Sequence, residues 1–441
     1  MTIQKHIFSN GFRLIYENPF SKVNITNIKV YCKLGSVNEN TEDTHGVSHF
    51  IEHMCFKGTK KIPKPIDIFT KYDKIGAYFN ATTDKEYTYY SVKCDDEYVC
   101  NCIYILSDML MNSIFNETEY KKEEKVVIEE NESSNDDPED ILDENIDKLL
   151  YEGTSYARPV DTISYHKNKL NHETVKEVYD LFYRPHQMAI SIVSHLPFEK
   201  IIEMIEKTYF INSKKKIIEI PEKYKINKNI SFQKKIKYSF ERKTGINVTH
   251  LCIGFRTAFD DRYVLNLLNY ILSGPMSAKL FMILREENGV TYSSDTDTNY
   301  YHIYGDFKIY ASAIEEKILK NGKKKGVLPL LIDLINELIK NGINQKEIDL
   351  AKGYLKGTMR LDLEDSDTLT FYNGEKQILD EKEQMIPYSE LFEEKYKNIT
   401  KKEIDDVIKK YFKKKNMNVC FVGEKLNNIE IIKKECEKLC Q

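Results

Sequence analysis

Two histidines and a glutamate stand close together near the amino terminus, in the segment His49-Phe50-Ile51-Glu52-His53. In a helix, residues four apart lie on one face with their Cβ atoms about 6 Å apart, so both imidazoles can reach a single cation. Glu52 falls beside this pair and can accept a proton from a water at the metal without being a ligand itself. The spacing therefore predicts a catalytic zinc site that is held by His49 and His53 and uses Glu52 as general base.

A catalytic zinc ion takes three protein ligands and keeps a fourth position open, so a further donor must come from another part of the chain. The segment 117–133 has helical spacing, and Glu123, Val127, Glu130 and Ser134 follow one another on the face that should turn toward the protein. Burying two carboxylates there is costly unless a cation or strong hydrogen bonds compensate. We therefore predict Glu130 as the third ligand and Glu123 as the acceptor of an N–H bond from a ligand histidine.

Other interpretations of these residues are weaker. A chance HxxEH segment should occur in roughly one in fifty chains with this histidine and glutamate content. His45 also stands four residues before His49, but it precedes Gly46 and is expected at or before the start of the helix. The nine cysteines are odd in number and scattered, which favours free thiols in a reducing compartment over a cysteine metal site.

The whole chain has the composition of a globular protein, with 41% apolar and 30% charged residues. Its 441 residues exceed one ordinary core, so two domains of roughly 200 residues each are expected. The net charge of -4 predicts no general attraction to nucleic acid or to a membrane surface, and no apolar run is long enough to span a bilayer. Residues 1–10 resemble neither a signal peptide nor a clear transit peptide. We therefore expect a cytoplasmic location and leave a mitochondrial one open.

Strand and helix patterns follow an order that repeats once along the chain. Strands are expected at 12–16, 25–32, 77–81, 87–92, 188–193 and 248–255, and helices at 46–56, 95–115, 117–133, 138–151, 261–272 and 277–286. The lysine-rich, weakly patterned segment 213–245 suggests a linker between a catalytic domain at 1–212 and a second domain at 246–441. One α+β plan used twice explains this order, and two unrelated α+β domains are the alternative.

The surroundings of the two histidines carry a family resemblance. Residues 35–39 (GSVNE) and 46–59 (GVSHFIEHMCFKGT) closely resemble the pitrilysin family of zinc metallopeptidases, the inverzincins, and its short branch of mitochondrial processing peptidases fits over essentially the whole chain. The resemblance implies two related α+β domains, each a mainly antiparallel sheet packed with helices. It also implies one zinc ion per chain, with the third ligand at Glu130, 77 residues after His53. Two chains, as a homodimer or a heterodimer with a related subunit, would close around a chamber.

The resemblance also implies a substrate-binding edge strand. Residues 76–83 (GAYFNATT), followed by Glu86, Thr88 and Tyr90, are similar to the strand on which the family binds extended peptides. Such a strand has free backbone groups that can pair with a peptide by β-augmentation. Asn80 and Ala81 are the residues expected to bind substrate there.

Two further pairs of residues are implied to contact the substrate. Residues 280–293 (LFMILREENGVTYS) are similar to a family segment whose arginine and tyrosine, here Arg285 and Tyr292, are implied to steady the substrate and its oxyanion. Asp140 and Glu144 stand 10 and 14 residues beyond Glu130, where processing peptidases carry acids that hold a basic presequence residue. A solvated helix face is the ordinary interpretation of such an acidic run.

Together these features predict a zinc-dependent endopeptidase that cleaves unfolded peptides or presequences inside a closed chamber. A noncatalytic scaffold subunit of a processing-peptidase-like complex is the alternative, but such subunits usually lack ligands that this chain retains. A regulatory zinc-binding module would not need Glu52. Residues 272–280 (LSGPMSAKL) lack the glycine run of relatives, which argues against the noncatalytic partner of the mitochondrial enzyme.

Overall fold

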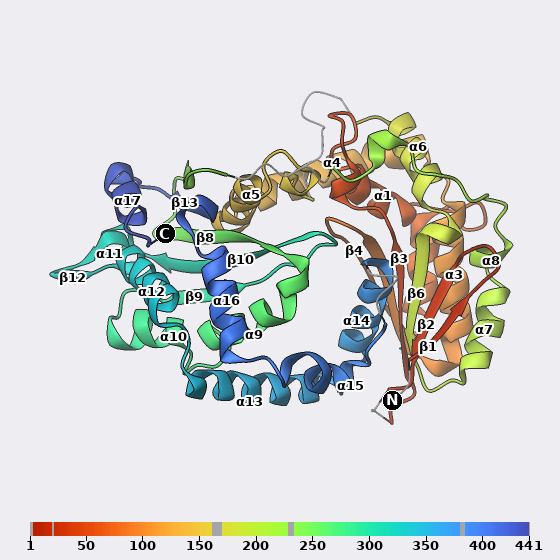
Figure 1. Ribbon diagram of the computed structural model, residues 1–441. Coiled ribbons are helices and arrows are strands. Elements are labelled where there is room, and N and C mark those ends of the chain that lie inside the picture. Colours follow the sequence, from red (N-terminus) through yellow and green to blue (C-terminus); the bar gives the residue numbers. More distant parts are fainter. Residues whose placement is uncertain (1–2, 20–21, 161–169, 228–232, 380–383, 441) are drawn as a thin grey trace. The chain divides into compact units, whose positions relative to one another are not determined.

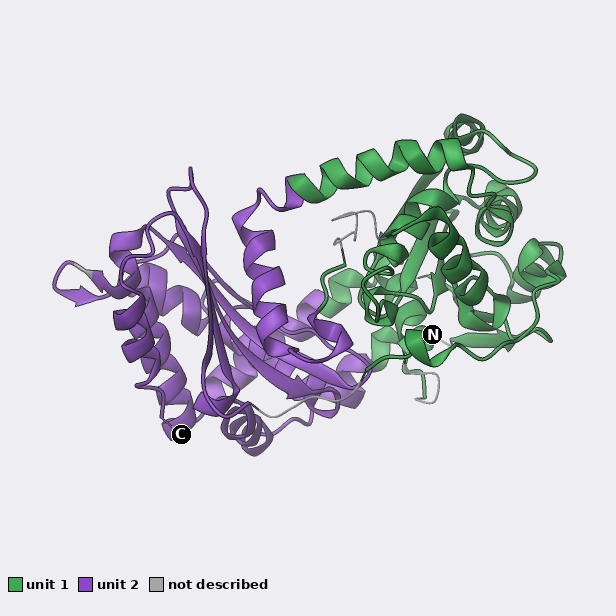
Figure 2. Ribbon diagram, turned by 90° about the horizontal axis from the view of Figure 1, so that it is seen from above, with its two compact units in different colours: residues 1–132, 158–227, 359–390 green, residues 133–157, 228–358, 391–441 purple. Residues whose placement is uncertain are grey.

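The computed structural model describes residues 3–19, 22–160, 170–227, 233–379 and 384–440 (Figure 1). The chain forms two compact units, each built from three segments (Figure 2). Unit 1 comprises residues 1–132, 158–227 and 359–390, and unit 2 comprises residues 133–157, 228–358 and 391–441. Each unit therefore includes a short segment that is distant in sequence from most of the unit.

A sheet forms the centre of unit 1. Its described strands are β1 (Gln4–Ile7), β2 (Arg13–Glu17), β3 (Ile25–Cys32), β4 (Tyr78–Thr83), β5 (Thr88–Asp95) and β6 (Met188–Val193). They lie in the order β1-β2-β6-β3-β5-β4, with β2 and β6 parallel and the other neighbours antiparallel. Strands β2, β3 and β6 are almost fully buried because helices cover both faces of the sheet.

Most helices of unit 1 cover one face of this sheet. They are α1 (Val47–Cys55), α2 (Pro65–Asp73), α3 (Val99–Asn112), α4 (Glu117–Ser134), whose last two residues belong to unit 2, α6 (His172–Phe182), α7 (Phe198–Glu206) and α8 (Tyr209–Asn212). Phe50, Met109 and Val178 are among the buried side chains that join these helices to the sheet in one core. Helix α14 (Ser366–Leu379) covers the opposite face, where Tyr31 and Ile378 are buried together.

The sheet of unit 2 contains β7 (Lys237–Arg242), β8 (Thr249–Ala258), β9 (Ser293–Asp297), β10 (Tyr304–Ala313) and β13 (Met417–Gly423). A separate hairpin is formed by β11 (Lys320–Asn321) and β12 (Lys324–Lys325). The α- and π-helices that lie wholly within this unit are α5 (Pro138–Leu150), α9 (Arg262–Leu272), α10 (Lys279–Phe281), the π-helix η7 (Met282–Glu287), α11 (Glu315–Leu319), α12 (Val327–Asn341), the π-helix η8 (Phe392–Tyr396), α16 (Lys401–Tyr411) and α17 (Ile429–Cys436). Helices α13 (Gln345–Asp362) and α15 (Tyr388–Leu391) each span a boundary between the units.

The two sheets share one topology. Unit 2 has the strand order β7-β13-β8-β10-β9, in which β7 and β13 are parallel and the other neighbours antiparallel. In unit 1 the order from β2 onward is β2-β6-β3-β5-β4. When the five strands of each set are numbered in chain order, both sheets have the spatial order first, fifth, second, fourth and third. The prediction of one α+β plan used twice, with mainly antiparallel sheets, is therefore confirmed.

Each sheet is covered on one face by a helix from the other half of the chain. Helix α5 packs on β8 and β13 of unit 2, with Leu142, Ile146 and Leu150 buried. In unit 1, α14 packs on β3 and β6, and the hydroxyl of Tyr31 donates a hydrogen bond to the carbonyl of Phe371 at 3.2 Å. The helices therefore exchange sheets at equivalent points of the two repeats.

The compact units differ in extent from the predicted bounds 1–212, 213–245 and 246–441. Residues 133–157 belong to unit 2, residues 359–390 belong to unit 1, and β7 lies within the stretch expected to be a linker. An amphipathic helix must cover an apolar surface, but its own sequence does not say which sheet supplies that surface. For this reason the order of elements along the chain did not reveal the exchange.

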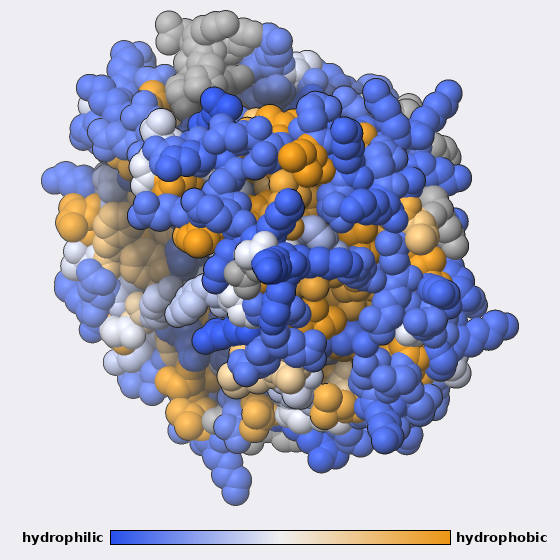
Figure 3. Space-filling view, turned by 90° about the vertical axis from the view of Figure 1, so that its left-hand side faces the viewer, coloured by the Kyte–Doolittle hydropathy of each residue, from blue (hydrophilic) through white to orange (hydrophobic). Residues whose placement is uncertain are grey.

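The face of the molecule in Figure 3 is mainly hydrophilic, with apolar residues in separate patches. Scattered exposed apolar side chains are normal on a folded protein. Among the described residues, no helix combines the length and the apolar character needed to cross a bilayer.

Gly374→Ala should destabilise unit 1, because a Cβ atom at this position of α14 would clash with the ring of Tyr31. Overpacking of a filled core costs about 1–3 kcal/mol. Gly353 and Gly357 in α13 have open space around them, so alanine there should be neutral or stabilise by up to about 1 kcal/mol. Thermal unfolding of the three variants tests this. A Gly374→Ala protein that melts like the other two would contradict the described packing of α14.

Candidate metal centre

Helix α1, which carries both histidines, is anchored at its first turn by a buried carboxylate. Gly46 precedes the helix with a left-handed φ of 76°, which glycine adopts at little cost. Glu39 accepts hydrogen bonds from the backbone N–H of Gly46 at 2.7 Å and of Ser48 at 2.9 Å. A carboxylate is favoured at a helix N-terminus, although burial raises the pKa of Glu39 to about 8. Glu39 therefore fixes the start of α1 just before His49.

The two imidazoles of α1 point toward one another. Nε2 of His49 lies 3.0 Å from Nε2 of His53, and their ring planes are nearly perpendicular. His49 is buried and His53 is partly buried. Two ring nitrogens that converge in this way can share a proton or a cation between them.

Glu123 of α4 forms a hydrogen bond with the Nδ1 atom of His53. Nδ1 of His53 lies 2.8 Å from Oε1 of Glu123, and Lys57 pairs with Oε2 of Glu123 at 2.5 Å. Burial opposes ionisation of Glu123, but the bonds to His53 and Lys57 outweigh it and lower the pKa of this carboxyl. For His53, burial lowers the pKa, but Glu123 and the charges of Glu52 and Glu130 raise it overall. An ionised Glu123 keeps the proton of His53 on Nδ1 and leaves Nε2 to face the site.

Glu130 completes a group that can hold a metal ion. Its Oε2 lies 3.5 Å from Nε2 of His53, and the ligand atoms of His49, His53 and Glu130 all lie within 4.8 Å of one another. Two imidazole nitrogens and one carboxylate oxygen suit a catalytic zinc ion with one open position. The donor set therefore fits the predicted metal.

The expected burial of the whole stripe on α4 was wrong in part. The buried residues of this helix are Tyr120, Glu123, Val127 and Asn131, whereas the side chain of Glu130 is 51% exposed. Glu130 thus lies at the border of the buried face of α4, half exposed to solvent, and still reaches His53. Glu129, the neighbouring acid, is also exposed but does not belong to the ligand group.

Glu52 lies next to the histidines and is held by a threonine. The hydroxyl of Thr83, the last residue of β4, donates a hydrogen bond to Oε2 of Glu52 at 2.6 Å. Burial raises the pKa of Glu52, while Thr83 and the two histidines act in the opposite direction. A partly buried carboxylate with a raised pKa beside a metal group is suited to proton transfer near neutral pH.

The predicted substrate strand lies at the edge of the sheet. Strand β4 is last in the strand order, and its side chains alternate between exposed and half-buried. The side chain of Asn80 accepts a hydrogen bond from the N–H of Ala81 at 2.9 Å. Both residues therefore belong to the edge strand, and their contact with a peptide stays a prediction.

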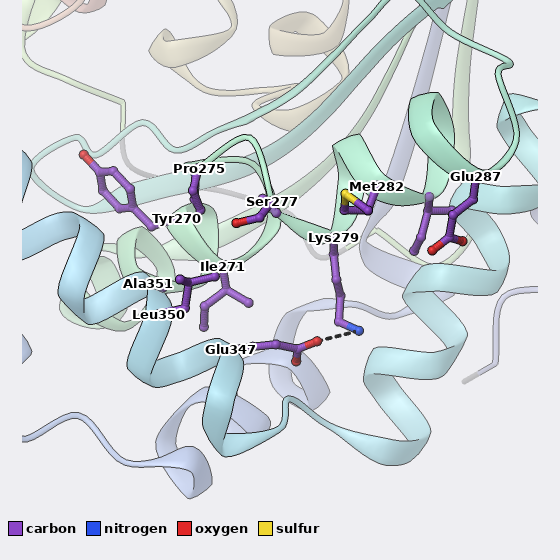
Figure 4. A pocket seen from close by; sticks show the side chains of 12 residues that line it. Tyr270, Ile271, Pro275, Ser277, Lys279, Met282, Glu287, Glu347, Leu350 and Ala351 are labelled. Carbon is purple, nitrogen blue, oxygen red and sulfur yellow. Dashed lines mark ion pairs between the residues drawn. The ribbon is translucent and has the colours of Figure 1, made fainter.

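Arg285 and Tyr292 lie together in unit 2. The Arg285 guanidinium is 5.4 Å from the centre of the Tyr292 ring, and Tyr292 is 85% exposed. Arg285 belongs to η7, whose Met282 borders a pocket of about 260 Å³ next to α13, where Lys279 pairs with Glu347 at 2.9 Å (Figure 4). Arg285 is not among the residues that line this pocket.

Asp140 and Glu144 lie on α5, also in unit 2. Asp140 is exposed, and Glu144 pairs with Lys148 one turn later at 2.6 Å. The helix buries a different face, formed by Leu142, Ile146 and Leu150. This arrangement matches a charged, solvated helix face, and a substrate contact of these two acids stays a prediction.

Glu39, Lys57 and Thr83 were not predicted as parts of the site. Each residue stands in a segment that resembles the pitrilysin family. The resemblance therefore indicated that these segments matter, but it did not predict the contacts of the three side chains. A hydrogen bond to a helix start, or from a strand end to a glutamate on a helix, leaves no periodic pattern in the sequence. Lys57, one turn after His53, could have been considered as a counter-charge for Glu123.

Family models match most of the chain. The model of insulinase, peptidase family M16, matches residues 16–162, and the model of the peptidase M16 inactive domain matches residues 169–355. The chain belongs to peptidase family M16. The resemblance drawn from the histidine motif is thereby confirmed, and the metal-ligand group lies within the first of the two matches.

Relatives and solved structures of M16 proteins extend this result. An uncharacterized zinc protease of Bacillus subtilis, YmxG, is 30% identical over 387 residues, which covers 86% of this chain and 88% of that one. An uncharacterized zinc protease of Rickettsia felis is 30% identical over 360 residues, or 79% and 81% of the two chains. A protease from Helicobacter pylori has the same fold with a TM-score of 0.84 at 20% identity, over 96% of this chain and 99% of that one.

Glu130→Gln should weaken zinc binding far more than Glu129→Gln, because Glu129 points about 100° away around α4. Loss of an outer partner of a ligand costs about 10–100-fold in metal affinity, and loss of a ligand should exceed this. Competition with a chelator, without any substrate present, measures both affinities. The opposite ranking would move the third ligand by one position.

Proposed function

We propose that this M16 protein is a zinc-dependent endopeptidase that cleaves unfolded peptides or presequences. The observation that carries the proposal is the group formed by His49, His53 and Glu130, with Glu52 beside it. The relatives that are named zinc proteases support the same class of activity. One zinc ion per chain is the proposed stoichiometry.

The proposed roles follow from the contacts of each side chain. His49, His53 and Glu130 would hold the zinc ion, which would supply Lewis-acid polarisation of the scissile carbonyl. Glu52 takes a proton from the attacking water and passes it to the leaving amine. Glu123 orients the imidazole of His53 and keeps its Nε2 available.

The substrate contacts form a second part of the proposal. The edge of β4 at Asn80 and Ala81 pairs with an extended peptide, which binds peptides of varied sequence through backbone bonds. Arg285 and Tyr292 steady the substrate and its oxyanion. A homodimer, or a heterodimer with a related subunit, forms the closed chamber, and the protein acts in the cytoplasm.

A noncatalytic scaffold subunit is the second candidate. A chain of complex III2 from Candida albicans shares the fold with a TM-score of 0.82 at 15% identity, over the full length of both chains. The fold alone therefore does not decide between a peptidase and a scaffold. The retained base Glu52, with all three ligands, favours the peptidase.

Glu52→Gln should keep zinc but lose cleavage by at least about 100-fold, because the amide keeps the shape of the side chain and cannot act as a base. Zinc content and hydrolysis of an unstructured fluorogenic peptide are measured for the zinc-loaded protein. Exposed Glu97 supplies the matched control, Glu97→Gln, which should cleave like wild type.

Wild type must also lose cleavage when a chelator removes zinc and regain it when zinc is returned. Zinc binding without cleavage by wild type would favour the scaffold or a regulatory module. Cleavage that survives in Glu52→Gln would exclude this residue as the base.

Asp140 and Glu144 are proposed to favour arginine two or three residues before the cleaved bond, through charge-assisted contacts. A peptide library cleaved by wild type and by Asp140→Asn/Glu144→Gln tests this, and the arginine preference should fall about 10-fold or more in the double variant. Glu129→Gln/Glu132→Gln removes the same charge from α4 and should leave the preference unchanged. Equal cleavage of arginine and alanine peptides by wild type would remove these acids from the substrate site.

A further inference from the structure

The acceptor closest to the hydroxyl of Thr83 is the carboxylate of Glu52. The Thr83 hydroxyl lies 2.6 Å from Oε2 of Glu52 and 3.4 Å from the hydroxyl of Thr88. Thr88 donates its own proton to the carbonyl of Leu34 at 2.9 Å, so it could only accept from Thr83, and its distance is much longer than that to the Glu52 carboxylate. The proton of Thr83 therefore goes to Glu52, and this charge-assisted bond fixes one of the two oxygens of that carboxylate.

The backbone of Thr83 faces the open edge of the sheet. At the turn after β4, the N–H of Asp84 donates to the carbonyl of Tyr87 at 2.8 Å, which directs Asp84 toward β5. Backbone groups in an antiparallel pair alternate in direction from one residue to the next. Those of Ala81 and Thr83 must then point away from β5, and the bond from the Ala81 N–H to the Asn80 side chain agrees with this.

The strand end and the metal helix are also connected by a second route. The N–H of Val37 donates to the carbonyl of Lys85 at 2.9 Å, and the N–H of Ser36 donates to the carbonyl of Asp84 at 3.3 Å. Two residues after Val37, Glu39 binds the first turn of α1. The segment 36–39 thus binds the β4–β5 turn at one end and the first turn of α1 at the other. These bonds hold Thr83 close to Glu52.

We propose that Thr83 is a positioning residue that couples the peptide-binding edge of β4 to the base Glu52. Its backbone pairs with the peptide next to Ala81, while its side chain orients the carboxylate that receives the proton. The scissile bond is then brought opposite the end of β4, about 7 Å along the strand from Ala81. This inference rests on the proposed peptidase function.

The test compares Thr83→Val, Thr83→Ser and the control Thr244→Val. Valine keeps the branched shape and suits a strand, so β4 and its backbone pairing are retained. For Thr83→Val we expect kcat to fall about 10–100-fold, which is part of the roughly 10²–10⁴-fold that a positioned base contributes, with KM and zinc content unchanged. Thr83→Ser, which keeps the hydroxyl, should recover most of the lost kcat. Thr244 is exposed in a loop outside the site, and Thr244→Val should behave like wild type.

A crystal structure of zinc-loaded Thr83→Val provides a readout that does not depend on activity. The Glu52 carboxylate should leave its position in the wild-type structure, while β4 and the histidines stay in place. An unchanged kcat in Thr83→Val, an equal loss in Thr83→Ser, or a Glu52 that does not move would each overturn the proposal. If wild type cleaves no peptide, the proposed function fails, and the crystal structure still tests the contact between Thr83 and Glu52.

Discussion

The bond between His53 and Glu123 is the contact on which the metal centre depends. A histidine binds a cation through Nε2 only while that nitrogen keeps its lone pair, so the proton on Nδ1 needs an acceptor. Glu123 is that acceptor, and Lys57 stabilises its ionised form from the other side. Two nitrogen lone pairs 3.0 Å apart repel each other, so the pair formed by His49 and His53 is stable only with a proton or a cation between the rings. The protein thus holds these groups in a geometry that a cation completes.

Helix α4 brings two different functions to this site. Glu123 and Glu130 stand two turns apart on one helix. Glu123 accepts the hydrogen bond from Nδ1 of His53, and Glu130 lies near Nε2 of the same ring as the third ligand of the group. The helix is otherwise polar, with few buried side chains, and core packing contributes little to its position. The placement of its acids therefore depends strongly on the contacts with α1, in which Glu123 and Lys57 take part.

The sequence predicted the parts of the fold and site that follow a period or a spacing. The spacing of His49 and His53 and the helical stripe on α4 indicated which side chains should meet, and strands 25–32 and 188–193 were predicted with the bounds that they have. The contacts of Glu39 and Thr83 were not predictable, because each joins segments whose approach is set by the tertiary fold. The exposure of Glu130 was also missed, since a helical wheel gives the direction of a residue but not where the covering surface ends.

The exchange of α5 and α14 has a consequence for the order of events during synthesis. The sheet of unit 1 contains all its described strands once residue 193 has been made, but α14, which covers its second face, begins only at Ser366. At about 5–20 residues per second, ribosomes need roughly 10–35 s to add the intervening chain. During that time Tyr31 and its neighbours on β2, β5 and β6 would be exposed to water and to other nascent chains. Unit 1 therefore cannot complete the packing of its sheet before α14, near the end of the chain, has been synthesised.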